Sequence, residues 1–593
     1  MNRGETWRQK AIALAGLLLV LVVPLLVDLA MPSPFRAPKS LAAHFLWATL
    51  AGLFLLRPHW DGWFAPAAAI MLAGLASALG GGVQVLWALL PPALAFLGLG
   101  ALRQLQPRWR ALLARGVVWS GVVQALVALT FYDPKGRPAS FALLEQGEGR
   151  YQWLGTMGNP ADVASFLVLP TVLSWDGFLR RRRFWWLLAA LVQSGVLLAT
   201  QTLSALVALL AGGGLMFFLY LPRHRRLKAA GALVVAVVLV LLGVPPLRQR
   251  LELAWEQVQS WGWMWVASAR GAAWTAALRM VASHPLVGVG FQQFEAHSFS
   301  FLTAEELADR GLVLGMETGF GEAHNELLQF VAETGLLGLA FIAFGVFLAL
   351  RSVGRAEDVA HRRMEKAGSQ SAPPLVAHWA PLLTAAGTLA MLQFPLQLAA
   401  IAGQWLVVAA LLLPPLAATP PIRGVRIGVA VALVVGAGWG SYGQWRAYRA
   451  VQSAEVLVTW LREKPRDRQA QELASAAYQG LRRKLAYLPW DYRAETTAGN
   501  LAREAGNWVE ALGHFRRALA LAERPETRFN VGVVLWVLGQ EEEALAHLAR
   551  AVMLNPAVLK TVTEPDLAQR LSRKLEVEGY FARVPWARTW LGH

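Results

Sequence analysis

Long apolar runs alternate with short polar turns over the first 447 residues of the chain. About thirteen runs of roughly 17 to 25 residues have the length that an α-helix needs to cross the hydrocarbon core of a bilayer. The runs lie near residues 12–31, 41–56, 64–80, 83–101, 112–131, 160–179, 184–200, 203–221, 229–246, 327–350, 377–394, 399–417 and 425–442. The pattern predicts an all-α, polytopic transmembrane helical bundle of about 12–13 spans, the first of which is retained rather than cleaved.

Composition indicates a membrane protein and removes several function classes. Mean hydropathy is +0.41 and only 16% of the 593 residues are charged, which excludes a set of soluble domains. The formal charge is +17, but basic clusters such as 180–183 adjoin apolar runs, so we assign them to anionic membrane lipid and not to nucleic acid. The chain has no cysteine, so disulfides, thiolate chemistry and cysteine-ligated metals are excluded.

The distribution of basic residues orients the chain in the membrane. With a cytoplasmic N-terminus, the basic loops all lie inside, at 103–110, 180–183, 223–228 and 351–366. The outer turns carry no lysine or arginine, at 80–82, 200–202 and 395. This asymmetry predicts that the long polar loop 247–326 and the C-terminal region both lie outside the cytoplasm.

After residue 447 the pattern changes to that of a charged helical region, which predicts a C-terminal domain (448–593) next to the transmembrane domain (1–447). Several positions recur at a period of 33, where Gly506, Ala511, Leu512, Phe515 and Ala518 return as Gly539, Ala544, Leu545, Leu548 and Ala551. The residue types and the period resemble the tetratricopeptide repeat, and we expect a more divergent helix pair over 454–488. Stacked helix pairs form a concave face, so the domain is either a docking surface for a partner protein or glycan, or a structural cap over the membrane domain.

The outer loop brings a cation and a titratable imidazole into one polar segment. Arg270 begins a helical stretch that carries Trp274 one turn later, and Pro285 with the glycines after it predicts a tight turn at the end of that stretch. His324 stands shortly before the apolar run that begins at Leu327. We therefore expect the imidazole at the mouth of the transmembrane bundle, where a lipid-linked substrate presents its head group.

Two sequence elements carry a resemblance to a known family. The first reads Arg-x3-Trp from Arg270, His-Pro-Leu-x-Gly-x-Gly from His284, His-Asn-Glu from His324 and Glu-x-Gly-Leu-Leu-Gly from Glu333. The second is Gly-Thr-Met-Gly-Asn-Pro-Ala-Asp over 155–162, which opens an apolar run. Over residues 152–417 the chain resembles the O-antigen ligase and O-antigen polymerase superfamily.

This resemblance implies a GT-C-like, metal-independent glycosyltransferase of the bacterial cytoplasmic membrane, with its catalytic loop on the outer face and without a cofactor. It implies an undecaprenyl-diphosphate-linked glycan as donor and a hydroxyl on a lipid or a protein as acceptor. His324 matches the family's loop histidine, the general base, and Arg270 matches its loop arginine, a diphosphate ligand. Four further residues are expected to bind substrate, namely Arg279, Asn325, Glu326 and Asn159.

One departure from the family's pattern leaves a cation missing. Family members commonly carry a Ser-Arg-Gly triplet that supplies a second phosphate-binding arginine. This chain reads Thr-Leu-Ser-Ala over 202–205, with Leu203 in the place of that arginine. The candidate replacements on the outer side are Arg279, Lys135, Arg137 and Arg150.

Other functions remain open from the sequence. An O-antigen polymerase, a ligase and a protein O-oligosaccharyltransferase differ only in their acceptor. A non-catalytic transporter or scaffold on the same fold is a further alternative. A transporter needs ionisable groups at mid-bilayer depth, whereas the few in these spans lie near span ends, at Asp28, Arg115, Asp176 and His378. His297 has no close second ligand, so no metal site is predicted.

Overall fold

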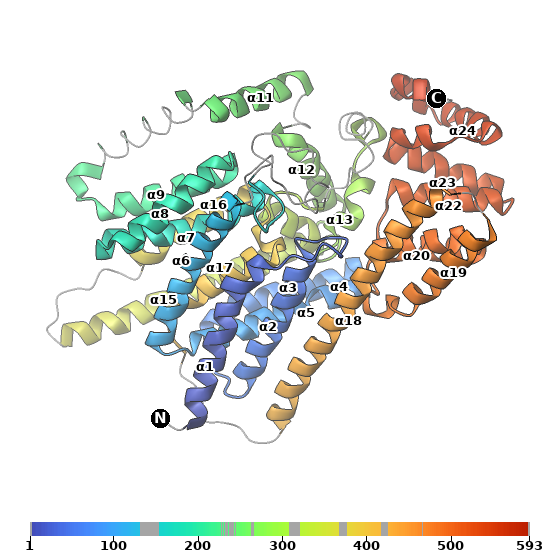
Figure 1. Ribbon diagram of the computed structural model, residues 1–593. Coiled ribbons are helices and arrows are strands. Elements are labelled where there is room, and N and C mark those ends of the chain that lie inside the picture. The colour runs from blue at the N-terminus through green and yellow to red at the C-terminus, as the bar shows by residue number, and fades with distance from the viewer. Residues whose placement is uncertain are drawn as a thin grey trace.

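Helices and short turns account for the described chain. The computed structural model describes residues 3–130, 153–226, 228, 231, 235, 242–243, 245–261, 266–307, 321–366, 376–416, 425–464 and 467–590 (Figure 1). Within these residues no strand occurs, and several helices have the length and composition of membrane spans. The predicted all-α, polytopic class is therefore confirmed.

The bundle and the elements outside it follow one another in chain order. The bundle consists of α1 (Arg3–Leu17) with its continuations η1 (Leu18–Val22) and η2 (Val23–Leu25), α2 (Ala37–Leu55), η3 (Gly62–Phe64), α3 (Ala65–Gly81), α4 (Val83–Ala88), α5 (Leu90–Arg103), α6 (Pro107–Thr130), α7 (Pro160–Arg181), α8 (Phe184–Ala199), α9 (Leu203–Tyr220), η6 (Arg223–Arg225), α15 (Glu326–Lys366), α16 (Val376–Leu392), η9 (Pro395–Gln397), α17 (Ala399–Leu412) and α18 (Val425–Arg462). The loop between α9 and α15 contains α11 (Pro245–Trp261), α12 (Val266–Ser283), α13 (Phe294–His297) and η8 (Ser298–Phe301). The C-terminal helices are α19 (Arg468–Arg482), η10 (Leu485–Tyr487), α20 (Tyr492–Glu504), α21 (Trp508–Leu521), α22 (Pro525–Val537), α23 (Glu541–Leu554), η11 (Pro556–Thr561), α24 (Pro565–Val577), α25 (Tyr580–Arg583) and η12 (Pro585–Trp590).

Every predicted apolar run coincides with helix except 229–246, most of which lies outside the described residues. Among the described residues, seven helical segments are long and apolar enough to cross a membrane, and four shorter apolar helices accompany them. The first run ends earlier than the predicted residue 31, because the helix stops at Leu25. Asp28 then organises a polar turn, in which its Oδ1 accepts from the Ala30 N–H (3.0 Å) and its own N–H donates to the Pro34 carbonyl (3.0 Å).

The span in α15 is broken at Gly335, where φ is 67° and ψ is −170°. The break frees backbone donors and acceptors on both of its sides, and the turn 285–290 that follows α12 bonds to them. Four backbone hydrogen bonds join the two segments, from Val289 N to Ala332 O (3.1 Å), Gly290 N to Glu333 O (2.9 Å), Leu336 N to Pro285 O (2.8 Å) and Leu337 N to Leu286 O (3.1 Å). The predicted tight turn after α12 is confirmed, and it is the bonding partner of the broken helix.

Glycine is required on both sides of this junction. A Cβ atom on Gly335 would lie 2.3 Å from the backbone carbonyl carbon of Leu286, and one on Gly288 would lie 2.3 Å from that of Glu333. Both glycines also have positive φ, at 67° and 69°. A side chain at Gly335 or Gly288 is therefore excluded both by overlap with the facing backbone and by the backbone conformation.

Glu333 ties the junction to the loop that precedes α15. Its buried carboxylate accepts from the N–H groups of Gln292 (2.9 Å) and Phe294 (3.3 Å) and from Nε2 of Gln329 (3.1 Å). Gln329 in turn accepts from the Ala323 N–H at 2.9 Å. The start of α15 is thereby held at a defined position relative to the break.

A single helix, α18, connects the bundle to the C-terminal helices (Figure 1). Its first part packs on α2, where Ser441 Oγ donates to the Leu41 carbonyl (3.3 Å). Its last part packs on α19 and α20 through buried residues that include Val451 and Val458. The helix runs without a break through residue 447, so the two predicted domains share it.

The C-terminal helices repeat at the period seen in the sequence. The helices α20 and α21 begin at Tyr492 and Trp508, and α22 and α23 begin 33 positions later, at Pro525 and Glu541, with matching lengths of 13 and 14 residues. The two helix pairs have equivalent glycines in their turns, with φ of 81° and 75°. The helix pair expected over 454–488 is formed by the end of α18 with α19. The tetratricopeptide assignment remains a resemblance.

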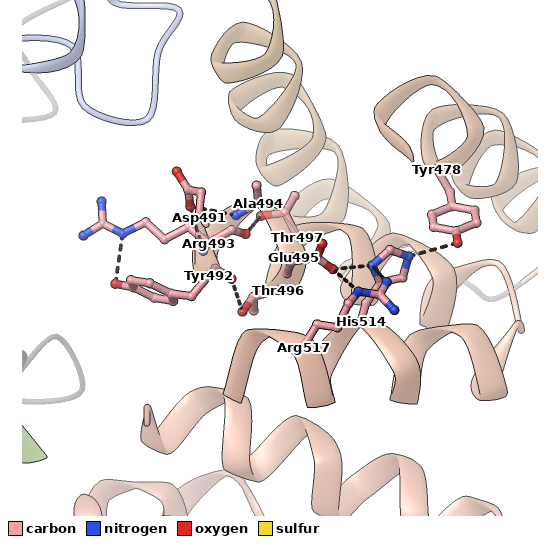
Figure 2. A network of polar contacts seen from close by, with 10 residues as sticks. All are labelled: Tyr478, Asp491, Tyr492, Arg493, Ala494, Glu495, Thr496, Thr497, His514 and Arg517. Atoms are coloured by element: carbon pink, nitrogen blue, oxygen red, sulfur yellow. Dashed lines mark hydrogen bonds and ion pairs between the residues drawn. The ribbon is translucent and has the colours of Figure 1, made fainter. Parts of the chain in front are cut away.

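A buried polar network joins α19, α20 and α21 (Figure 2). Nε2 of His514 lies 3.0 Å from the Tyr478 hydroxyl, and its Nδ1 lies 2.7 Å from the Glu495 carboxylate. Arg517 Nε donates to the same carboxylate at 3.1 Å. Because each buried polar group has a partner, the network fixes how these three helices pack.

Glu523 docks the C-terminal domain on the outer loop. Its carboxylate accepts from Ser300 Oγ of that loop (2.7 Å) and from Arg528 (2.9 Å) and Arg550 (3.0 Å) of its own domain. Burial acts to raise the pKa of Glu523, but the hydrogen bonds from Arg550 and Ser300 and the charges of both arginines outweigh it and lower the pKa to about 2. The carboxylate is therefore stabilised in its charged form by the docked arrangement.

Arg524, the next residue, makes the second docking contact. Its guanidinium pairs with Glu295 of the outer loop and lies over the rings of Phe299 (5.3 Å) and Tyr492 (4.9 Å). The Tyr492 hydroxyl also donates to Glu295, at 3.3 Å. These contacts match the structural-cap alternative, because the domain covers loop 294–307 and holds it by charge and by stacking.

Replacement of Gly335 by alanine is expected to destabilise the protein by about 2 kcal/mol or more, because alanine is strained at this φ and ψ and its Cβ would overlap the backbone of Leu286. Gly387→Ala in α16 is the matched control, since a Cβ there meets no atom within 4 Å. The measurement is the thermal unfolding temperature of each purified variant in detergent. Equal unfolding temperatures for the two variants would contradict the junction described above.

Stability is expected to fall in acid through Glu523. A carboxyl whose folded pKa is about 2, against an ordinary value of 4.5, contributes stability that is fully present above pH 4.5 and is lost as the pH falls towards 2. The contribution is about 3 kcal/mol. Glu523→Gln should lower the unfolding temperature at pH 7 and flatten its decline between pH 4.5 and 2, whereas the exposed Glu542→Gln should change neither. An acid decline in Glu523→Gln as steep as in the parent would refute this role.

Candidate active site at the junction of α12, α15 and α16

His324 lies in the short segment that leads into α15. Its backbone is left-handed, with φ of 54°, a conformation that residues other than glycine adopt rarely and that is concentrated at functional sites. The next residue, Asn325, caps α15, because its Oδ1 accepts from the Leu328 N–H at 2.9 Å. The strained backbone and the cap together fix the imidazole at the N-terminal end of the span.

The imidazole of His324 packs against the segment 392–394, at the end of α16. Its ring meets that of Phe394 edge to face, with centroids 4.7 Å apart. Its Nδ1 lies 3.5 Å from Oε1 of Gln393, whose Nε2 donates to Ser204 Oγ (2.7 Å). Because Ser204 orients the amide of Gln393, the amide oxygen faces Nδ1 of the imidazole.

Arg270, on α12, reaches the same segment. Its Nη1 donates to the Leu392 carbonyl at 3.0 Å, at the C-terminus of α16, where the helix dipole favours a cation. Arg270 and His324 therefore contact consecutive residues of one segment. The structure brings together the two residues that the sequence assigned to catalysis.

Arg36, which no sequence pattern singles out, is a second arginine in this cluster. Its guanidinium lies over the ring of Phe394 (5.5 Å) and pairs with Glu322 (2.8 Å) and, at longer range, with Asp162 (3.7 Å). The side chain is 45% exposed. Burial raises the pKa of Glu322, although Arg36 acts to lower it. The only sequence signal for Arg36 is its place in a polar turn between the first two apolar runs.

The second family element, 155–162, lies against the turn that carries Arg36. The buried Lys39 donates to the carbonyls of Leu26 (2.6 Å), Phe35 (2.7 Å) and Thr156 (2.7 Å), so it fastens this element to the start of α2. Asp162, in the first turn of α7, supplies the more distant carboxylate of the cluster. Two sequence regions about 120 residues apart thereby meet at the site.

Arg279, a predicted substrate ligand and a candidate for the missing cation, makes a bidentate ion pair with Glu306 (2.6 and 2.8 Å). It also donates to the Phe301 carbonyl at 2.9 Å. The described contacts do not bring it to the segment 392–394. The other candidates lie outside the described residues, namely Lys135, Arg137 and Arg150.

The remaining predicted ligands make contacts within the fold. Asn159 caps α7, because its Oδ1 accepts a backbone N–H at 2.8 Å, and Asn325 caps α15 as described above. Glu326 accepts from the Leu396 N–H (2.6 Å) and from Nε2 of Gln397 (3.3 Å). It therefore holds the segment after residue 394 beside His324. A substrate-binding role for these three residues remains a prediction.

The arrangement can bind an anion and accept a proton. Two guanidinium groups and one imidazole surround the segment 392–394, with a single aromatic ring between Arg36 and His324. Over the described ranges, no three histidine, aspartate or glutamate side chains form a group that could hold a metal ion. Arginine forks match phosphate oxygens, and imidazole is the usual general base near neutral pH.

The fold defines a polytopic helical membrane protein in which Arg270, His324 and Arg36 gather around the segment 392–394. Residues 187–343 match the family model described as O-antigen ligase. The resemblance seen in the sequence is confirmed over residues 187–343, a segment that includes both Arg270 and His324. Such a domain supports glycan transfer in pathways of the O-antigen or lipopolysaccharide type. No curated protein matches the chain.

Proposed function

We propose that the protein transfers a glycan from an undecaprenyl-diphosphate-linked donor to an acceptor hydroxyl at the outer face of the membrane. The contact of Arg270 and His324 with consecutive residues, 392–394, carries this proposal. This proximity supports a mechanism in which Arg270 binds phosphate and His324 accepts a proton from the same bound substrates. The acceptor is a lipid-borne glycan hydroxyl in the ligase reaction, and polymerase or transfer to protein differs only in that acceptor.

The transfer step uses His324 as the base. The acceptor oxygen bonds to the anomeric carbon of the glycan, the bond from that carbon to the diphosphate oxygen breaks, and the polyprenyl diphosphate leaves with the electron pair. The acceptor proton moves to Nε2 of His324, because Nδ1 faces the amide oxygen of Gln393. The proposed transfer reaction needs no metal ion, because two arginines supply the positive charge that stabilises the diphosphate.

Arg270 and Arg36 stabilise the leaving diphosphate. Negative charge grows on its oxygens in the transition state, and fixed guanidinium groups stabilise that charge without reorganisation. Arg36 takes the place of the missing family arginine. The stretch around Leu203 lies beside the same segment, because its neighbour Ser204 accepts the hydrogen bond from Gln393. A cation on the ring of Phe394 therefore occupies the region where the family's arginine is expected.

His324→Asn and Arg270→Gln should each lower transfer by about a hundredfold or more while the protein stays folded. Asparagine suits the His324 position because it tolerates a left-handed backbone but accepts no proton. The assay incubates the full chain with a polyprenyl-diphosphate glycan and candidate acceptors and follows the product by mass. His224→Asn and Arg248→Gln are the controls, since both residues are exposed and lie outside the cluster. Parent-like transfer by either site variant would overturn the role assigned to that residue.

Arg36→Gln should raise the KM for donor about tenfold or more, because a hydrogen bond between charged groups contributes about 1.5–3 kcal/mol. Glu322→Gln removes a carboxylate that competes with the diphosphate for Arg36, so it should leave the donor KM unchanged or lower it. Steady-state kinetics of both variants at varied donor concentration measure the two effects. If Arg36 served only to hold Glu322, both variants would lose stability and activity in parallel, and its role as diphosphate ligand would be excluded.

A further inference from the structure

A groove with three basic residues opens between α18 and α19. Its volume is about 420 Å³, and Arg446, Arg449 and Lys484 supply its charge. Leu457 and Leu481 form part of its apolar wall. No aspartate or glutamate lines it, so the groove carries an excess of positive charge.

Within the described part of the chain, Arg446 and Lys484 make no side-chain hydrogen bond and no ion pair, whereas Arg449 lies 4.0 Å from Asp28. Arg446 lies over the ring of Tyr442 at 5.8 Å, and Arg449 lies over that of Trp445 at 5.0 Å. The aromatic rings hold the guanidinium groups in place and leave their N–H groups available to an anion.

The groove continues an exposed apolar stripe of the same helix. Along α18 the exposed residues follow at steps of three or four, namely Ile427 (54%), Val431 (56%), Val435 (64%), Trp439 (68%) and Tyr442 (54%). Such steps keep side chains on one helix face, and Arg446, Ala450, Ser453 and Leu457 in the groove extend the series. The apolar stripe therefore leads directly into the basic groove.

The length of α18 indicates that the change from apolar to basic residues along this helix occurs at a membrane surface. Its 38 residues span about 57 Å, whereas the hydrocarbon core is about 30 Å thick. The stripe lies in the segment that qualifies as a membrane span, and the rings of Trp439, Tyr442 and Trp445 stand where aromatic residues favour the boundary with water. The basic residues follow these rings, at the depth of lipid phosphates.

We propose that this groove binds the phosphate-bearing head group of an anionic membrane lipid, whose acyl chains lie along the exposed stripe of α18. Arg446 and Lys484 contact the phosphate. A soluble phosphate compound would use the cations but not the stripe, so the continuity of the two surfaces favours a lipid. The groove borders the turn that carries Arg36, because Asp28 of that turn lies 4.0 Å from Arg449, but none of its lining residues belongs to the cluster around His324.

The test measures lipid binding by the full chain in detergent micelles. Phosphatidylglycerol and phosphatidylcholine are added in parallel, and bound lipids are counted by native mass spectrometry, with inorganic phosphate as a soluble competitor. The variant Arg446→Gln/Lys484→Gln removes the two unpaired cations. The control Lys464→Gln/Arg468→Gln removes the same charge from residues near the ends of the same two helices that do not line the groove. The charge-conserving pair Arg446→Lys/Lys484→Arg checks that any loss reflects charge and not misfolding.

Phosphatidylglycerol should be retained about 25-fold less by the Arg446→Gln/Lys484→Gln variant, because each of the two basic residues near an anionic surface contributes about a fivefold factor. The control and charge-conserving variants should retain it within twofold of the parent. Equal retention by parent and groove variant, or no preference for phosphatidylglycerol over phosphatidylcholine, would overturn the proposal. Displacement of the lipid by millimolar inorganic phosphate would also overturn it, because the acyl chains would then contribute nothing.

Discussion

The break in α15 at Gly335 is the constraint on which the site depends. A helix that is interrupted inside a membrane exposes backbone N–H and C=O groups that lipid cannot satisfy, and each unsatisfied group costs several kcal/mol. The turn 285–290 satisfies these groups, so the end of α12 and the middle of α15 form one rigid unit. Arg270 lies on α12 and His324 just ahead of α15, and Glu333 braces the intervening loop. The same backbone bonds that complete the broken span therefore set the positions of the two reactive side chains.

The site is assembled from parts of the chain that no local pattern connects. The segment 392–394 is contacted by Arg270, His324 and Arg36, which come from three different regions of the sequence. The proposed replacement of the arginine missing near Leu203 by Arg36 illustrates that charge at a site can come from any element that reaches it. In the described structure the guanidinium of Arg36 pairs with Glu322, a carboxylate that an anionic ligand of this arginine would have to displace.

The C-terminal domain acts on the site through the outer loop. Glu523 and Arg524 hold Ser300 and Glu295, and the loop that contains them is bonded to Glu333 through Phe294. These contacts connect the C-terminal helices, through the loop, to the junction at Gly335. The continuous helix α18 joins this domain to the bundle and also carries the basic groove at the boundary between lipid and water.

The sequence by itself determined the membrane class, nearly all of the spans and the 33-residue repeat, because these follow from apolar length and helical period. A local motif also predicted that Arg270 and His324 lie near each other. The sequence also identified the turn after α12, since proline and glycine act locally. The tertiary structure alone decided where the first span ends, that Arg36 joins the cluster, and that Asn159 and Asn325 serve as helix caps. The physical reason is that the local sequence around a polar side chain does not specify which group that side chain will bind. Only the packing of distant helices decides whether its oxygen or guanidinium meets a backbone, a carboxylate or a substrate.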